Sequence, residues 1–488
     1  MLQQGRIISV VILFSLAAST IKSQTKDSFI TRLRGGNVKF EIGYASTLVP
    51  AQEGNLVSLS HLFTKPFEPF AYHLNPSFLA YTSQAGVSLE FTPGFSLSLN
   101  RFVDFNSRVR EEIDAAIVDF RSEDFVVSYP QVSGDYLNFG GISSVAVVLP
   151  ISTEGWTIFG VSQNLLNLRG SYINSGLESQ MVSNVDVSEG TQKVIFNGFL
   201  DATLDVRATV RGLSAGVAKV MSPEFALAFT INRYQAELRA NGFANVDGVM
   251  IFGGTEHVFN NPQDPWPNTL RQSAKARYRG NGLGLNLSGT YHLKPNVWVL
   301  DAVLELPFTI KMSGQVEQEF NKIPALNLDA VIRGEELDEI LDPVKLKLSQ
   351  LTLTEPDSFE TYDALSLSIP KKIKGSLTYL GKRLKTRLTF GKYLSRIQLE
   401  YEPNRIGLNS AFFVNAQFEV ARFQLSMGLT KIKPFARKTD EEPVGDSNHI
   451  IPSFALGANL NLSKNSKIYL ILSSTPSPAL RSRVTFNF

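Results

Sequence analysis

The sequence predicts an all-β fold, namely a transmembrane antiparallel β-barrel of about 14 strands, within a range of roughly 12–16. Three features of the sequence support this prediction: hairpins with one apolar and one polar face, a secretory signal at the start, and a last strand that ends on phenylalanine. We also expect short helices in the extracellular loops and an N-terminal segment that is either a plug inside the barrel or a periplasmic lead-in.

The clearest hairpin lies between Gly282 and Met312. On its first arm the apolar residues occupy alternate positions, which are Leu283, Leu285, Leu287, Tyr291 and Leu293. The turn is Lys294-Pro295-Asn296, and on the return arm the even positions from Trp298 to Met312 are apolar. This alternation with a period of two predicts a β-hairpin with one apolar and one wet face.

The length of this hairpin favours a membrane barrel over the alternative, a long hairpin of a soluble β-sandwich. Trp298 and Phe308 lie on the same face, and their spacing corresponds to roughly 25 Å of height in a tilted strand, which matches the apolar band of an outer-membrane barrel. Aromatic side chains favour the interface between lipid and water. We therefore expect Tyr291 and Trp298 at the periplasmic interface and Phe308 at the outer one.

The composition excludes several classes of protein. The 488 residues are 43% hydrophobic and 19% charged, with a mean hydropathy of -0.01, and no window after residue 25 has the ~18 uninterrupted apolar residues of a membrane helix. The absence of cysteine excludes disulfides, thiolate metal sites and cysteine nucleophiles. Two of the 47 basic residues lie in the signal, which leaves 45 against 45 acidic ones, and this balance argues against a nucleic-acid partner.

Residues 1–23 have the pattern of a secretory signal peptide. Arg6 supplies the positive charge, Ile7–Ala18 forms an apolar core too short to span a bilayer, and cleavage is expected after Ser23 or Ser19. Residues 24–80 lack long alternation and are rich in turn residues, whereas regular alternation starts near residue 85. We therefore divide the chain into a signal peptide (1–23), an N-terminal plug or periplasmic segment (24–80) and the barrel (81–488).

Short turns and long polar connections alternate along the barrel region, as in outer-membrane barrels. The long connections are expected at 171–191, 239–272, 313–362 and 432–450. One helix is expected over Ser107–Arg121, capped by Asn106 or Ser107, and a short acidic helix over 334–341. Leu384–Phe390 and Ser395–Tyr401 are expected to pair as a hairpin.

The last strand places Val484, Phe486 and Phe488 on one face and Arg481 and Arg483 on the other. A terminal strand that ends on an apolar-face phenylalanine is similar to the signal that outer-membrane barrels present to their assembly machinery. We therefore expect that machinery, together with outer-membrane lipid, among the partners of this protein.

The polar face of the alternating strands predicts which charged residues point into the barrel. These lumen-facing candidates are Glu90, Asp301, Glu305, Glu400, Glu419, Arg481 and Arg483, together with Asn232. Two interpretations remain open, pairing of charges across the lumen and contact with a substrate, and the first is favoured. None of the five histidines lies in a catalytic or metal-binding motif, so we predict no enzyme activity, no metal and no cofactor.

Two short motifs resemble the FadL-type long-chain fatty-acid transporters. One is Asn75-Pro76-Ser77, where the family usually has alanine at the third position, and the other is the strand from Gly282 to Pro295 before its turn. The resemblance implies a 14-stranded barrel in the bacterial outer membrane, with Asn75 and Pro76 in an N-terminal hatch and a lateral opening for hydrophobic compounds. Related PorV-type barrels instead act on secreted proteins at the cell surface. The resemblance therefore implies passive transport of hydrophobic small molecules or, alternatively, a surface scaffold or secretion accessory that acts through extracellular loops.

Overall fold

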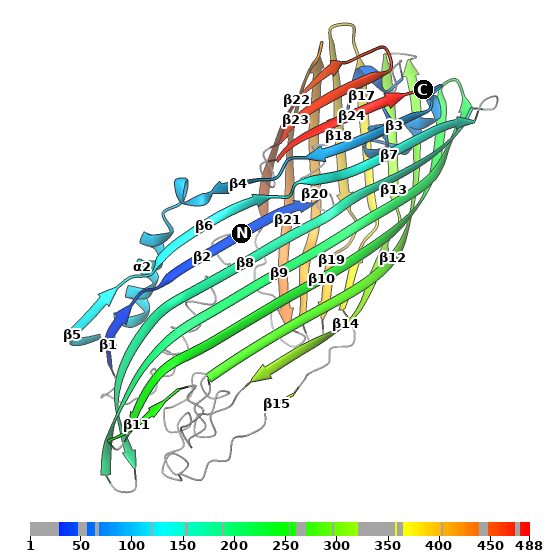
Figure 1. The fold of residues 1–488 in the computed structure, drawn as a ribbon. Helices are drawn as coiled ribbons and strands as arrows, with labels where there is room; N and C mark the ends of the chain where they lie inside the picture. The colour runs from blue at the N-terminus through cyan, green and yellow to red at the C-terminus, as the bar shows by residue number, and fades with distance from the viewer. Residues whose placement is uncertain are drawn as a thin grey trace.

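In the computed structural model, the wall of the molecule is a closed antiparallel barrel (Figure 1). The structure describes residues 29–46, 56–63, 68–118, 121–151, 155–187, 190–252, 254–259, 270–294, 297–320, 357–358, 365–401, 404–438, 448–473 and 479–488. The signal peptide and the acidic helix expected from the sequence lie outside these residues.

Fourteen spanning strands form the barrel, as the sequence predicts, and three of them consist of two consecutive segments. In order around the wall they are β3 (Gly86–Thr92), β7 (Gly141–Ile151), β8 (Trp156–Val187), β9 (Gly190–Ser222), β10 (Phe225–Phe252), β12 (Leu270–Lys294), β13 (Trp298–Glu305) with β14 (Phe308–Phe320), β17 (Lys372–Leu380) with β16 (Leu365–Ile369), β18 (Leu384–Tyr393) with β19 (Ile397–Tyr401), β20 (Asn404–Val420), β21 (Phe423–Lys438), β22 (His449–Asn461), β23 (Ser466–Ser473) and β24 (Ala479–Asn487). The last strand pairs with the first, from Ser482 opposite Phe91 to Asn487 opposite Gly86, and this pairing closes the barrel.

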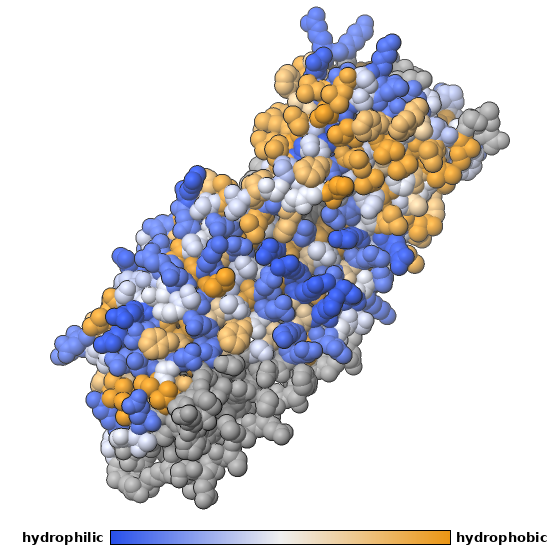
Figure 2. Space-filling model, viewed as in Figure 1, coloured by the Kyte–Doolittle hydropathy of each residue, from blue (hydrophilic) through white to orange (hydrophobic). Residues whose placement is uncertain are grey.

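On the face shown in Figure 2, an apolar band covers the end of the barrel that carries the short turns and the C-terminus, and a polar surface follows it. The alternation explains the band, because along β12 Leu283, Leu285 and Leu287 are exposed whereas Gly282 and Ser288 are buried. Tyr291 and Trp298 lie on this outer face beside the short turn between β12 and β13, and the Trp298 ring lies 4.8 Å from that of Tyr379. Phe486 on the outer face of β24 and Phe488, which follows the strand, are also exposed.

The wall continues far beyond the apolar band. β8, β9, β10 and β12 are 32, 33, 28 and 25 residues long, and they sweep away from the end that carries the C-terminus (Figure 1). The prediction of long loops at 171–191 and 239–272 is therefore wrong, because β8 and β9 are paired up to Val187 and Gly190, and β10 forms a further hairpin with β11 (Thr255–Val258). Beyond the membrane the outer face of a strand meets water instead of lipid, so the hydrogen-bonded ladder continues while the strict apolar alternation is lost.

The N-terminal strands lie in this extension rather than inside the barrel. β1 (Phe29–Arg34) and β2 (Asn37–Ser46) pair antiparallel with β8 on one side. On the other side they run parallel to β5 (Arg121–Ser128) and β6 (Gln131–Asn138). β4 (Phe95–Ser98) pairs with β6, and β15 (Asp357–Ser358) pairs with β14.

A small apolar core holds this outer part of the molecule together. Ile30, Leu33 and Val38 pack with Val109 and Ile113 of helix α2 (Phe105–Ile117). Asp104 caps the helix by accepting from the Ser107 backbone N–H and hydroxyl, instead of the predicted Asn106 or Ser107. These hydrogen bonds lower the pKa of Asp104.

Three neighbouring strands are interrupted at the same height of the wall. The breaks lie at Leu306-Pro307 between β13 and β14, at Pro370-Lys371 between β16 and β17, and at 394–396 between β18 and β19. The pairing registers place these breaks side by side, since β13 pairs with β17 and β14 with β16. The predicted hairpin of Leu384–Phe390 with Ser395–Tyr401 is therefore wrong, because these segments form one interrupted strand that pairs with β20 throughout.

Two of these interruptions, between β13 and β14 and between β16 and β17, also exchange the two faces of the strands. β12 pairs Asn286 with Glu305 below the break but Asn281 with Lys311 above it, a shift of one residue. A slip of one residue moves every following side chain to the opposite face. Ile310 and Met312 are consequently buried inside, although the uninterrupted pattern predicts them on the lipid face.

Candidate functional site

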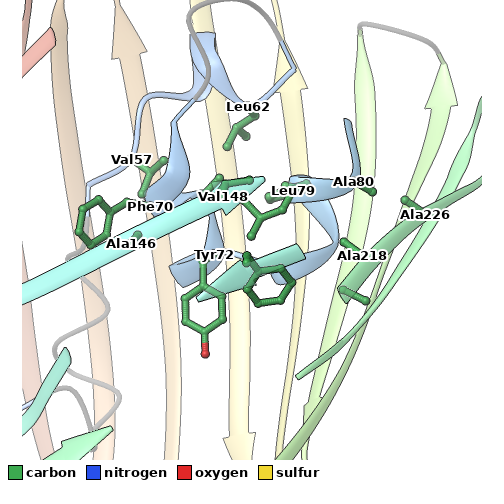
Figure 3. Close-up of a cluster of buried hydrophobic side chains, with 14 of the residues drawn as sticks. Val57, Leu62, Phe70, Tyr72, Leu79, Ala80, Ala146, Val148, Ala218 and Ala226 are labelled. Atoms are coloured by element: carbon green, nitrogen blue, oxygen red, sulfur yellow. The ribbon is translucent and has the colours of Figure 1, made fainter. Parts of the chain in front are cut away.

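A segment with three short 3-10 helices lies inside the barrel at the height of the apolar band (Figure 3). The helices are η2 (Leu59–His61), η3 (Pro69–His73) and η4 (Pro76–Tyr81). We refer to the described residues 56–63 and 68–82 as the inner segment. Phe70, Phe78 and Leu79 are fully buried against inward side chains of the wall, including Val148 and Ala226.

Asn75 ties the inner segment to the wall. Its side-chain oxygen accepts from Ser77 N (2.9 Å) and Ser77 Oγ (2.6 Å), and Pro76 follows as the first residue of η4. Its amide nitrogen lies 3.1 Å from the carbonyl oxygen of Gly289 and 3.2 Å from Asp301 Oδ1. The Asn-Pro motif therefore combines a helix cap with an anchor to the β12–β13 hairpin.

The anchor continues into a buried ion pair. Arg387 donates to both oxygens of Asp301, at 2.7 and 2.9 Å, and also to Thr378 and Ser376. The side chains of Asp301 and Arg387 are 0% and 2% exposed. A bidentate pair with this many additional hydrogen bonds can compensate for the desolvation of both charges.

A second ion pair lies where the last strand meets the first. Arg483 of β24 lies opposite Glu90 of β3 and donates to its Oε2 at 2.8 Å, while Arg481 approaches Glu90 Oε1 at 4.0 Å. Arg483 also donates to the carbonyl oxygen of Leu56 and lies 4.2 Å above the ring of Phe70. This arginine therefore joins the closing seam of the barrel to the inner segment.

Further polar contacts surround the inner segment. Glu419 accepts from the backbone N–H of Leu59 (2.7 Å) and Ser60 (3.0 Å), and also from the Ser60 hydroxyl. Tyr72 donates to Ser214 Oγ at 2.9 Å. The polar groups of the inner face at this height therefore bind polypeptide.

The inner face changes character on the side of the inner segment away from the short turns. There the inward side chains form a buried apolar cluster, which we call the apolar inner wall: Leu165, Val210, Tyr234, Ala236, Tyr278, Ile310, Met312 and Leu365. On β10 the change follows directly after Asn232, which faces Tyr72 of the inner segment, whereas Tyr234 belongs to the apolar inner wall.

Glycines on β12 make room for this apolar surface. Gly280, Gly282 and Gly284 face inward, where Met312, Ile310 and the stacked rings of Tyr234 and Phe308 lie against them. A Cβ at Gly284 would lie 2.9 Å from Tyr234 Cε2 and 3.2 Å from Phe308 Cδ1. The Gly-x-Gly pattern of this strand thus allows large apolar side chains to lie flat on the wall.

The predicted site residues do not all lie where the alternation places them. Glu90, Asp301, Glu419 and Arg483 are buried inside. Glu305 and Arg481 also point inward, Glu305 toward Lys372 at 3.4 Å and Arg481 toward Glu90 at 4.0 Å. Phe308 and Glu400 are corrections. Phe308 follows a strand interruption that exchanges the faces, whereas Glu400 lies on β19, where Leu399 packs against the apolar inner wall and the polar face therefore points outward. Phe308 stacks on Tyr234 inside the barrel, with ring centroids 4.0 Å apart, and Glu400 pairs with the exposed Arg405 at 2.7 Å.

Sequence reasoning missed several residues of the site. Arg387 lies at an inward position of β18, next to the exposed Leu388, and only the alternation of that strand could have indicated it. Lys374, whose Nζ donates to the carbonyl oxygen of His73, lies at an inward position of β17 that the same kind of alternation could have indicated. Tyr72 lacks any comparable pattern or motif. Within the described ranges, no three histidine, aspartate or glutamate side chains gather as metal ligands, and no helix is long and apolar enough to cross a membrane.

These features define a class of protein, a closed β-barrel of the outer-membrane type whose interior is occupied by its own N-terminal polypeptide. Neither a protein-family model nor a curated protein matches the sequence.

Three solved structures with a similar chain layout belong to hydrocarbon or FadL-type transporters. A Pseudomonas aeruginosa FadL homologue is 10% identical, with 90% of this chain and 96% of that chain covered and a TM-score of 0.45. The Ralstonia pickettii toluene transporter TbuX is 11% identical over 86% and 93% of the two chains, with a TM-score of 0.39. The P. putida toluene transporter TodX is 10% identical over 85% and 90%, with a TM-score of 0.40.

Proposed function

We propose that this protein mediates the passive passage of hydrophobic small molecules across the bacterial outer membrane. The observation that supports the proposal is the apolar inner wall, which is built from the inward side chains of neighbouring strands directly beyond the inner segment. Water-filled porins have a polar interior instead. The free energy of an apolar solute falls when it enters such an interior from water, whereas an ion or a sugar would lose its hydration there.

In this proposal the inner segment acts as the hatch, with Asn75 and Pro76 at its anchor. The segment blocks straight passage at the height of the apolar band, since its aromatic side chains are packed against the wall. The outer-membrane location fits the exposed apolar band and the outward Val484, Phe486 and Phe488 on the last strand, which suit recognition by the barrel assembly machinery.

Uptake into proteoliposomes tests the proposal. Vesicles containing the purified full chain should take up a labelled alkane or fatty acid faster than empty vesicles, and should take up labelled glucose no faster. Equal rates for the apolar solute in both kinds of vesicle would refute the transport function.

A second candidate function is a surface scaffold or secretion accessory, and one observation favours it. The ordered part beyond the membrane has its own apolar core, formed by β1, β2, α2 and the ends of the long strands. A scaffold should retain a protein partner in defined stoichiometry when purified from intact membranes. If the barrel is purified from intact membranes without any protein partner, this result would contradict the scaffold role.

A further inference from the structure

Four arginines form one row across the outer face of four neighbouring strands. They are Arg169 of β8, Arg207 of β9, Arg239 of β10 and Arg277 of β12. Each faces the next in the pairing register, with Arg169 opposite Arg207, Arg207 opposite Arg239, and Arg239 opposite Arg277. Neighbouring strands lie about 4.8 Å apart, so like charges placed in this way repel one another.

Two carboxylates lie within this row of four arginines. Asp205 contacts Arg207 at 3.1 Å and Arg169 at 3.8 Å. Glu237 contacts Arg239 at 2.7 Å and Arg277 at 3.6 Å, and it also binds a fifth arginine, Arg279, at 2.9 Å.

The arginines are more exposed than their carboxylate partners. The side chains of Arg207, Arg239, Arg277 and Arg279 are 54%, 49%, 56% and 61% exposed, against 34% for Asp205 and 30% for Glu237. The carboxylates therefore hold the guanidinium groups in place, and the outer surface that remains is positive.

This positive surface, which we call the arginine patch, begins where the apolar band ends. Arg211 and Arg233 are exposed next to the exposed apolar residues Leu213 and Ile231 on the same faces of β9 and β10. The row lies six residues beyond Leu213 on β9, which is roughly 15 Å of height at the usual strand tilt. In Figure 2 strongly hydrophilic surface directly follows the apolar band over the middle of the molecule.

We propose that this arginine patch binds the phosphorylated headgroup of a glycolipid in the outer leaflet. The continuity with the apolar band places the acyl chains of such a lipid on the band and its headgroup on the patch. A headgroup that carries several anionic groups and extends roughly 15 Å along the barrel axis matches the height of the patch above the apolar band. A single phosphate would reach only the part of the patch next to the band. Arginine suits this role because its planar guanidinium forms two parallel hydrogen bonds to a phosphate group.

The test uses the purified full-length chain in a non-ionic detergent and bis-phosphorylated lipid A as the probe. The triple variant R207Q/R239Q/R277Q removes three charges from the row and leaves the inner face unchanged. We expect its affinity for lipid A to fall roughly ten- to hundredfold. The wild type should bind dephosphorylated lipid A at least tenfold more weakly than the phosphorylated form.

The matched control K382Q/R383Q/R422Q removes three exposed cations from the short-turn end of the barrel. It should bind lipid A like the wild type, and both variants should keep the heat-modified migration of a folded barrel. Equal binding by the row variant and the wild type would overturn the proposal, as would equal binding of dephosphorylated lipid A. Displacement of lipid A by an equimolar amount of inorganic phosphate would also overturn it, since the patch would then recognise free phosphate.

Discussion

Asp301 is the residue on which the anchoring of the inner segment most depends. It accepts from Arg387 and from Asn75 at once, so one carboxylate joins β13, β18 and the inner segment. The alternation of its strand predicts that Asp301 points inward, but no pattern in the sequence identifies a partner 86 positions away. Burial of the pair follows from the closure of the barrel.

Replacement of Asp301 by alanine should destabilise the barrel strongly. The change leaves the Arg387 guanidinium buried without its counter-charge, which typically costs about 3–5 kcal/mol. Unfolding in detergent, followed by tryptophan fluorescence against denaturant, measures the loss. Glu400→Ala is the control, since it breaks an exposed pair with Arg405 and should change stability by no more than about 1 kcal/mol. Similar losses in both variants would contradict the structural role of Asp301.

Phe308 and Glu400 show where alternation fails as a predictor of side-chain direction. Phe308 lies just beyond a strand break, and a slip of one residue there exchanges the two faces. Glu400 lies where the interior of the barrel is apolar, so the apolar face of its strand points inward and the polar face points outward. Pro307 and Pro370 were the available signals, because proline cannot donate to a ladder and marks bulges in strands. A third break, at 394–396, contains no proline.

At the scale of elements, the spanning strands were predictable and their extensions were not. Within the membrane, lipid on one side and polar groups on the other impose a period of two, as on β12. Beyond the membrane this difference disappears, so the paired ends of β8 and β9 resemble polar loops in sequence. The inner segment is equally difficult to predict, since 3-10 turns have no long periodicity and only Asn75-Pro76 marks one of them.

The seating of η4 can be tested by disulfide trapping in this chain, which has no cysteine of its own. Ser77 Oγ lies 2.5 Å from Thr290 Oγ1, so the pair S77C/T290C should form a disulfide under mild oxidation. Mass spectrometry of the proteolysed protein detects the cross-linked peptide. The control pair S77C/Y291C should not cross-link, because Tyr291 points outward. Cross-linking in both pairs, or in neither, would contradict this position of the inner segment.

At the scale of the whole molecule, polar and apolar zones succeed one another along the barrel axis. The short-turn half has an apolar exterior and an interior filled by the inner segment, where buried ion pairs lie beside apolar contacts, whereas the next zone has a polar exterior and an apolar interior. The sequence predicts the first zone through its alternation. The second zone depends on strand breaks and on glycines that leave space for partners from other strands, and such long-range packing is not visible in local patterns.

This arrangement predicts that the protein does not conduct ions steadily. An ion would have to pass the packed inner segment and then an apolar interior, at a large cost in hydration free energy. Recordings from the reconstituted full chain in planar bilayers should therefore show the baseline of protein-free membranes. Stable open-channel currents would indicate a water-filled path and contradict the arrangement.

The most direct test of the account is to locate a bound apolar molecule. A photoreactive fatty acid, irradiated with the purified barrel and mapped by mass spectrometry, should label β10, β12 and β14 around Tyr234, Tyr278 and Ile310. Excess unlabelled fatty acid should abolish this labelling, because the apolar inner wall offers a limited number of positions. Labelling confined to outward residues such as Leu213 and Leu283, and unaffected by competitor, would contradict a hydrophobic path through the interior.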